Sequence, residues 1–249
     1  MDFYSAARRS GFTLEHFGTI GSTNDHALAY VRAEGASRHF VVADEQTGGR
    51  GRLGRVWVSK PGNLYASLAL IDPAPKDKAF QLGFVAALVV FDTLCALGIA
   101  AQKLALKWPN DVLVEGKKIS GILIEGTLIG GHLGVVIGCG INIAHHPSDT
   151  LYPVTDLKSL GVFVSPLEVF AHFSAAFDLG LSHYQRGAGF GAVRERWLSL
   201  AHHVGGPIVV KDRKEERHGL FSGLDHDGRL LLDQDGRLVP IIAGDIFFE

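Results

Sequence analysis

The sequence predicts an α+β fold, in which a mixed β-sheet with flanking helices is followed by a small all-β module. Apolar strand-like runs and helical patterns share the first 204 residues. From Gly205 onward the chain changes to short β runs separated by Asp-Gly turns at 227–228 and 235–236. With 249 residues, 47% of them hydrophobic, the chain can bury a real core. We therefore expect one domain at 1–204 and a second at 205–249.

The first strands flank a helix start. The runs FGTI and HFVVA predict strands at 17–20 and 39–43, and Ser22, Thr23 and Asn24 are N-cap residue types placed just before a helical pattern. The glycine-arginine loop at 49–57 follows the second strand. The other elements expected in the first domain are strands at 63–70, 104–107, 112–127 with a reversal at 115–116, and 132–143, and helices at 77–97, from Ser165-Pro166 onward, and around 190–203.

The longest apolar run, FVAALVVFDTLCALGIAA, starts at Phe84 and contains Asp92, which favours a core helix over a membrane span. Cys95 and Cys139 both lie in apolar company, so we expect buried thiols and no disulfide framework. No signal peptide opens the chain. These features predict a cytoplasmic protein with no membrane partner.

The loop GGRGRLGRVW allows two functional interpretations. Interleaved Gly and Arg is typical of disordered RNA-binding tracts of the RGG type, and also of loops that close on an anionic small molecule. The chain carries 24 basic and 26 acidic side chains and shows no repetition, which favours the second interpretation and no nucleic-acid partner. A plain solvated turn is the remaining alternative.

Five motifs occur together in a specific order: STND at 22, GGRGRLGRVW at 49, KWPND at 107, GKKISGILIE at 116 and GCGINI at 138. In this order they resemble the biotin protein ligases over residues 12–249. The resemblance implies a mixed sheet like that of class II aminoacyl-tRNA synthetases and a C-terminal SH3-like β-barrel. It also implies that the chain activates biotin with ATP to biotinyl-5'-AMP and transfers biotin to a lysine of a carboxylase carrier domain. A lipoate or octanoyl ligase or transferase is the alternative with a similar fold.

The resemblance implies a biotin site. A glutamine and a Ser-Thr-Asn trio contact the ureido head in the family, and the first arginines of the loop hold the carboxylate and the acyl-phosphate. Hydroxyl and amide groups suit a neutral urea, although a plain helix cap is compatible with the same trio. The residues implied are Ser22, Thr23, Asn24, Gln46, Arg50, Gly51, Arg52 and Lys118.

Catalysis is expected at Lys118, Arg52 and Asp111. Lys118 matches the family lysine after KWPND, where an ammonium would offset charge that develops in the transition state. The adjacent Lys117 is expected to be solvated. Asp111 is expected to orient or deprotonate the incoming amine, the alternative being a purely structural turn residue.

ATP is expected at Arg55, Trp57, Asn110 and Asn142. Trp57 would stack on adenine or pack the closed loop, with plain core packing as the alternative, and Lys107 is either a phosphate contact or a surface lysine.

Mg²⁺ is expected to arrive with ATP, and no protein-bound metal is expected, because none of the twelve histidines shows a metal-ligand spacing. Leu53 stands where basic residues are common in the family, with an effect that the sequence does not give. About ten residues precede Phe12, so no DNA-binding domain is expected. The expected partner is the biotin carboxyl carrier protein domain of acetyl-CoA carboxylase or a related carboxylase, and a homodimer is left open.

Overall fold

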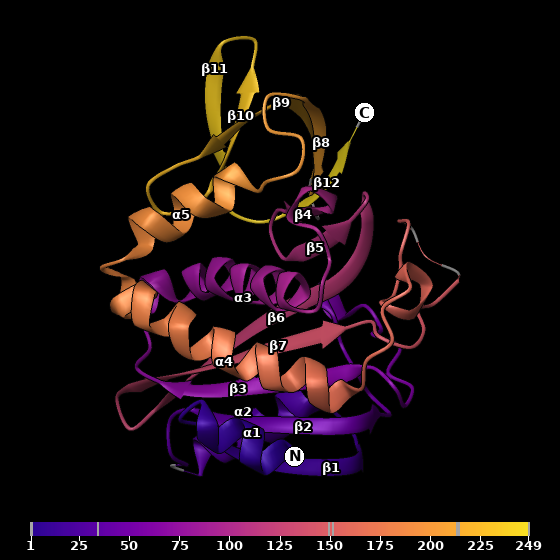
Figure 1. Ribbon diagram of the computed structural model, residues 1–249. Coiled ribbons are helices and arrows are strands. Elements are labelled where there is room, and N and C mark those ends of the chain that lie inside the picture. Colours follow the sequence, from indigo (N-terminus) through magenta and orange to yellow (C-terminus); the bar gives the residue numbers. More distant parts are fainter. Residues whose placement is uncertain (1, 34, 149, 151, 213–214, 249) are drawn as a thin grey trace.

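The computed structural model describes residues 2–33, 35–148, 150, 152–212 and 215–248. Its larger sheet has seven strands in the order β1-β2-β3-β7-β6-β5-β4. β1 and β2 pair in parallel and the other neighbours pair antiparallel, so the sheet is mixed, as the sequence predicts. The strands are β1 (Thr13–Ile20), β2 (His39–Gln46), β3 (Leu64–Ile71), β4 (Leu104–Lys107), β5 (Asp111–Val114), β6 (Lys117–Ile129) and β7 (His132–Ile141) (Figure 1).

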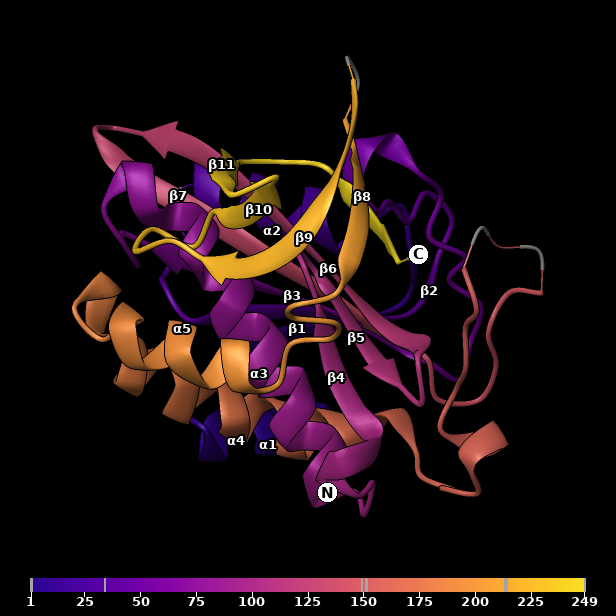
Figure 2. The same ribbon diagram turned by 90° about the horizontal axis from the view of Figure 1, so that it is seen from above.

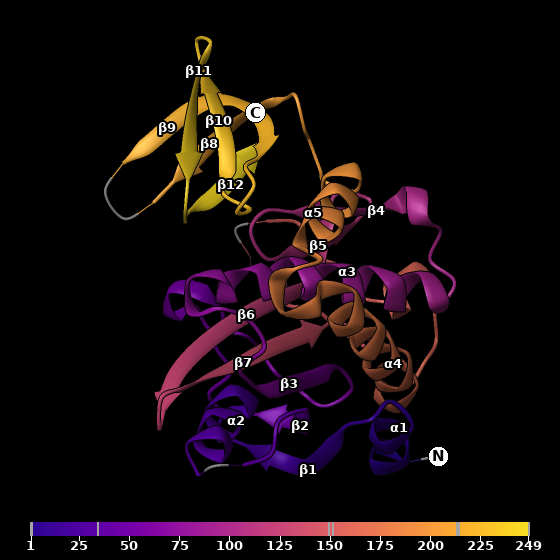
Figure 3. The same cartoon turned by 90° about the vertical axis from the view of Figure 1, so that its left-hand side faces the viewer.

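Helices cover both faces of this sheet. α2 lies on one face and α3 and α4 on the other (Figure 3). Strand β2 shows how alternation produces this arrangement, because Val41 packs with α2 while its neighbour Phe40 contacts Phe170 and Phe173 of α4. The helices are α1 (Phe3–Arg9), α2 (Thr23–Arg32), α3 (Leu82–Ala96), α4 (Pro166–Tyr184) and α5 (Phe190–Ser199), with 3₁₀ segments η1 (Arg52–Gly54), η2 (Lys76–Gln81), η3 (Ala101–Lys103), η4 (Lys158–Leu160) and η5 (Gln185–Gly187).

The most apolar helix is a core helix. The stretch Lys76–Ala96, formed by η2 and α3, is long and apolar enough to cross a membrane, but most of it is buried inside the protein. Residues on every side of α3 are covered, since twelve of its fifteen residues are buried. Because α3 is buried on every side, its sequence is apolar throughout and shows no amphipathic spacing.

The smaller sheet is antiparallel and contains β8 (Pro207–Lys211), β9 (Glu216–Leu224), β10 (Leu230–Gln234), β11 (Arg237–Ile241) and β12 (Asp245–Phe248), in the order β11-β10-β9-β8-β12 (Figure 2). The predicted turn at 235–236 joins β10 to β11, and both Asp235 (φ 55°) and Gly236 (φ 86°) have the left-handed backbone of a type I′ hairpin. The module fits an SH3-like domain, but the prediction of a barrel is wrong in one respect. Over the described residues β11 and β12 are the two edge strands and do not pair with each other, so the sheet is not closed into a barrel. The boundary at 204/205 stays a prediction, and Glu249 lies outside the described residues.

Candidate active site

A pocket of about 400 Å³ opens where the N-terminus of α2, the glycine-arginine loop, the Lys107–Asp111 segment and strands β6, β7 and β12 converge. Its lining includes every residue to which the sequence assigns a site role: Ser22, Thr23, Asn24, Gln46, Arg50, Gly51, Arg52, Arg55, Trp57, Asn110, Asp111, Lys118 and Asn142, together with Lys107. Five motifs spread over 120 residues of sequence thus meet around one cavity.

One part of the pocket is a network of neutral polar side chains. Ser22 caps α2, accepting a hydrogen bond from the backbone N–H of Asp25. The Oε1 of Gln46 accepts from both the N–H (2.8 Å) and the Oγ1 (3.0 Å) of Thr23, and its Nε2 donates to Ser59 Oγ at 2.9 Å. Ser22 is therefore the helix cap, and the bonded pair Thr23 and Gln46 lies beside it.

Asn24 continues this network and lies against a glycine. Its Oδ1 accepts from Ser67 Oγ (2.6 Å) and its Nδ2 donates to Glu125 Oε2 (2.8 Å). A Cβ atom at Gly138 would lie 2.1 Å from Asn24 Oδ1, so only glycine permits this approach.

Trp57 forms an apolar wall. A Cβ atom at Gly140 would lie 2.5 Å from the indole ring and one at Gly121 would lie 3.0 Å from it, so the ring rests on the backbones of β7 and β6. The Nζ of Lys118 lies 5.4 Å from the centre of the ring. The Trp57 Nε1–H is buried and has no hydrogen-bond partner among the described residues. A donor left unpaired in a ligand pocket is available to a ligand.

Lys118 and Asp111 form an ion pair beside this wall, with Nζ 2.7 Å from Oδ1 and side-chain exposures of 20% and 12%. The backbone of Lys118 is held on both sides, because its N–H donates to Pro153 O and its carbonyl accepts from Thr155 N. Its neighbour Lys117 is exposed and does not line the pocket. Strand alternation thus separates the two lysines as expected.

Arg50 is at the rim and faces a protein carboxylate. Its two terminal nitrogens donate to the carboxylate of Asp25 at 2.6 and 2.5 Å, and Glu125 Oε1 lies 3.7 Å away. The hydrogen bonds with Asp25 raise the pKa of Arg50. The expected contact between Arg50 and the biotin carboxylate would need an exchange of this partner.

Arg52 and Arg55 both approach Asp245 of β12. Arg52 Nη1 donates to Asn110 Oδ1 (3.3 Å) and to Gly244 O (3.2 Å), and lies 3.7 Å from Asp245 Oδ1. Arg55 forms a direct ion pair with Asp245, which raises the pKa of Arg55, whereas burial lowers the pKa of Arg52. Leu53, which lies between them, is 52% exposed and is not part of the pocket lining.

Lys107 is a buried pocket residue and no surface lysine. It is 8% exposed, and its Nζ lies 4.3 Å from the ring centre of Tyr152, 5.1 Å from that of Phe248 and 6.0 Å from that of Phe247. Burial lowers the pKa of Lys107. An ammonium held by aromatic faces keeps its charge available to an anion.

The two asparagines are tied to the surrounding backbone. Asn110 Nδ2 donates to Ile122 O at 2.8 Å, and Asn142 Nδ2 donates to Thr155 O at 3.1 Å. The Trp108-Pro109 peptide is cis, and β5 begins at Asp111, directly after Asn110.

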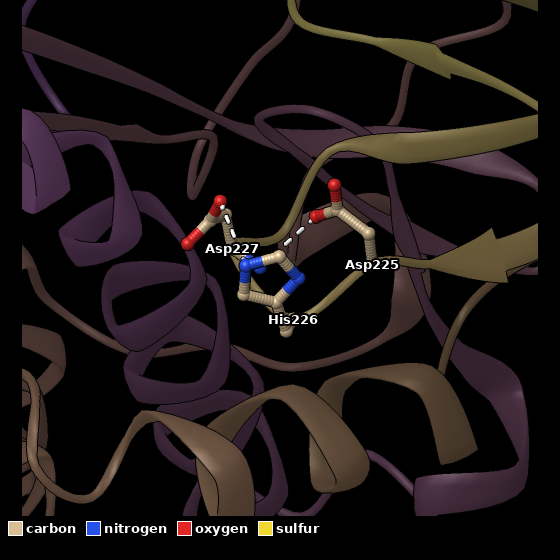
Figure 4. A group of neighbouring side chains, drawn as sticks. All are labelled: Asp225, His226 and Asp227. Atoms are coloured by element: carbon tan, nitrogen blue, oxygen red, sulfur yellow. Dashed lines mark hydrogen bonds and ion pairs between the residues drawn. The ribbon is translucent and has the colours of Figure 1, made fainter.

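One group of side chains outside the pocket has spacing suited to a metal ion: Asp225, His226 and Asp227, in the turn between β9 and β10 (Figure 4). Arg229 already pairs with both carboxylates, through Nε to Asp225 (2.8 Å) and Nη2 to Asp227 (2.6 Å). Asp225 also accepts from two backbone N–H groups of the turn. The carboxylates of Asp225 and Asp227 therefore stabilise the turn between β9 and β10.

The sequence interpretation missed several pocket residues from outside the motifs, among them Tyr152, Asp245 and Ile246. None belongs to a motif, and each enters the site through tertiary packing. Cys139 lies at the pocket as a buried free thiol, as expected, whereas Cys95 is free but only partly buried, so the prediction that both are buried is wrong for Cys95.

Comparison with known proteins gives consistent matches. Residues 19–142 match the model of the biotin/lipoate A/B protein ligase family, and residues 203–249 match that of the biotin protein ligase C terminal domain. A biotin–[acetyl-CoA-carboxylase] ligase of Paracoccus denitrificans is 38% identical over 240 residues, covering 91% of this chain and 97% of the relative. The biotin protein ligase of Aquifex aeolicus in complex with biotin and ATP superposes with a TM-score of 0.80 at 27% identity, covering 95% and 98% of the two chains. The Leishmania major biotin protein ligase in complex with biotinyl-5-AMP gives a TM-score of 0.65 at 27% identity, covering 92% and 98%.

Proposed function

The chain belongs to the biotin protein ligase family, and on that premise we propose which of its residues bind biotin, bind ATP and act in the reaction. It is an ATP-dependent ligase that activates biotin and transfers it to a carboxylase. In the first step a biotin carboxylate oxygen attacks the α-phosphorus of ATP and pyrophosphate leaves. In the second, a lysine amine of the carrier attacks the acyl carbon, loses a proton, and AMP leaves.

Biotin would lie along the neutral network, with its ureido group near Ser22, Thr23, Asn24 and Gln46. This network offers hydroxyl and amide groups to a head that is itself both donor and acceptor, and the Glu125 carboxylate is bonded to it through Asn24. Trp57 packs with one face on the glycine backbones of β6 and β7, and it would stack on adenine or pack the closed loop.

ATP would lie at the cationic group formed by Arg52, Arg55 and Lys107, with Asn110 and Asn142 nearby. The ATP phosphates and the biotin carboxylate are both anionic and repel each other, so a site that joins them needs fixed cations. Mg²⁺ enters as part of the nucleotide substrate, held mainly by phosphate oxygens and water.

The Lys118–Asp111 pair is the main support for this proposal, because it lies between the proposed biotin site and the proposed ATP site. Lys118 contacts Trp57, and Asp111 follows Asn110, the partner of Arg52. An ammonium at this position would stabilise charge on the reacting carboxylate and phosphate oxygens. Asp111 would orient the ammonium and accept the proton of the incoming amine.

We also propose the carrier domain of acetyl-CoA carboxylase or a related carboxylase as the partner. Residues 123–129 of β6 pair with β7 on one side, and the described strands leave their other side unpaired. An unpaired strand edge beside the pocket suits edge-to-edge docking of a β-rich partner, or of a second copy of this chain in a homodimer. The two free thiols fit a cytoplasmic location.

The decisive test is substrate dependence. The purified protein with ATP and Mg²⁺ should release pyrophosphate when biotin is supplied and should label a carrier domain with biotin, as measured by mass spectrometry. Equal activity with lipoate would favour the lipoate-type alternative, and pyrophosphate release without biotin would contradict the proposed site.

A further inference from the structure

Strand β12 of the C-terminal sheet presents a carboxylate to the glycine-arginine loop. Asp245, its first residue, is 15% exposed on its side chain and lines the pocket. Ile246 is fully buried, while Asp245 and Phe247 share one face of the strand because side chains alternate. Lys107 Nζ lies 6.0 Å from the ring centre of Phe247 and 5.1 Å from that of Phe248, so the end of β12 also lies against a pocket cation.

One carboxylate serves two guanidinium groups. Asp245 pairs directly with Arg55, and its Oδ1 lies 3.7 Å from Arg52 Nη1. The backbone carbonyl just before it, that of Gly244, accepts a hydrogen bond from Arg52 at 3.2 Å. The position of both arginines is therefore defined by the start of β12.

Charge explains why this contact matters. Among the described residues, and apart from Arg50, which pairs with Asp25, the pocket lining has four cations, Arg52, Arg55, Lys107 and Lys118, and two carboxylates, Asp111 and Asp245. Lys118 already has Asp111 as its partner. Without Asp245, the described lining residues would offer no carboxylate to Arg52, Arg55 and Lys107. Repulsion among these three cations would then favour positions of the two loop arginines outside the pocket, in solvent.

We propose that Asp245 is a positioning residue, which holds Arg52 and Arg55 in the pocket before the nucleotide arrives and so couples the C-terminal sheet to ATP affinity. This inference rests on the proposed ATP site at those two arginines. Asp245 acts through the arginines and is not itself expected to contact the reacting atoms.

The test is the steady-state kinetics of Asp245→Asn, followed by pyrophosphate release. Loss of one charge-assisted hydrogen bond corresponds to about a tenfold change in affinity, so we expect KM for ATP to rise about tenfold. KM for biotin should stay within about twofold, because the neutral network does not touch Asp245. Asp245→Glu should restore most of the ATP affinity, and Asp245→Ser offers a second neutral variant if the first folds poorly.

Glu216→Gln is the matched control. Glu216 belongs to the same sheet and pairs with Lys211 at 2.8 Å, away from the pocket lining, so its KM for ATP should be that of the wild type. An unchanged or lower KM for ATP in Asp245→Asn would overturn the inference, as would an equal rise in both KM values.

Arg55→Ala separates the inference from the proposal beneath it. If Arg55→Ala leaves KM for ATP unchanged, the proposed ATP site is wrong. If Arg55→Ala raises it and Asp245→Asn does not, only the positioning role fails. In the double variant, Asp245→Asn should add less than it does alone, since the two side chains act as one unit.

Discussion

Replacing Gly138 by alanine should weaken biotin binding while sparing ATP binding. The new Cβ would lie 2.1 Å from Asn24 Oδ1, whereas real Cβ contacts below 3.0 Å essentially do not occur, so the amide oxygen must move by about 1 Å. That movement breaks the hydrogen bonds of Asn24 with Ser67 (2.6 Å) and Glu125 (2.8 Å). One of these bonds is buried and the other is part-buried. At about 0.5–1.5 kcal/mol each they contribute about 1–3 kcal/mol to holding the amide in its binding position, so we expect biotin affinity to fall by up to roughly 150-fold.

The assay is isothermal titration calorimetry with biotin, supported by KM values for biotin and ATP from pyrophosphate release. Gly126→Ala is the control, because a Cβ there would meet its nearest atom, Gly134 O, at an ordinary 3.7 Å. Both variants replace a glycine in neighbouring strands of one sheet, so they share any general effect on strand stability. Biotin affinity that is unchanged in Gly138→Ala, or lowered equally in Gly126→Ala, would refute the role of Asn24 in the biotin site.

Four further predictions follow from the pocket. Lys118→Ala should slow adenylate formation by on the order of 10²-fold or more, the effect of one lost transition-state contact; a larger effect of Lys117→Ala would show that the catalytic lysine is misassigned. Arg52→Gly should still form the adenylate but release it, since losing charge-assisted hydrogen bonds costs about 1.5–3 kcal/mol of retention; biotin labelling of serum albumin no greater than with the wild type, at matched adenylate production, would contradict this. Trypsin should cut the loop at 48–56 quickly in the free protein and slowly with biotin and ATP, because ordering costs about 1–2 kcal/mol per residue that ligand contacts must offset; equal rates would exclude closure of the loop on ligand. EDTA should stop pyrophosphate release and added Mg²⁺ should restore it, and activity that survives EDTA would exclude Mg·ATP as the substrate.

Local signals predicted much of the fold. Helix α4 begins where Ser165-Pro166 places it, with Ser165 and Glu168 forming a reciprocal capping box. Helix α1 escaped prediction because FYSAARR has no apolar periodicity, and it is held instead by an Asp2 cap and by packing of Ala6 and Ala7. Strand β1 begins at Thr13, earlier than its apolar run, because pairing with β2 extends it.

The pocket lining followed from motifs, but its internal contacts did not. Sequence patterns could predict that four residues line the pocket, because each belongs to a segment with a recognisable pattern: Ser22, Thr23, Asn24 and Gln46. The partners of the loop arginines are single acidic residues: Asp25, the last residue of the STND motif, and Asp245, in ordinary strand sequence. Such ion pairs depend on how elements pack, which no local pattern records.

The distance along the chain between Arg55 and Asp245 has a consequence for synthesis. They are 190 residues apart, so at roughly 5–20 residues per second the ribosome makes the loop roughly 10–40 s before its counter-ion. All seven strands of the larger sheet are complete by Ile141, long before β12 is made. A nascent chain can thus fold its main sheet while the loop arginines still lack their carboxylate, and the charge balance of the pocket is reached only after translation has passed β12.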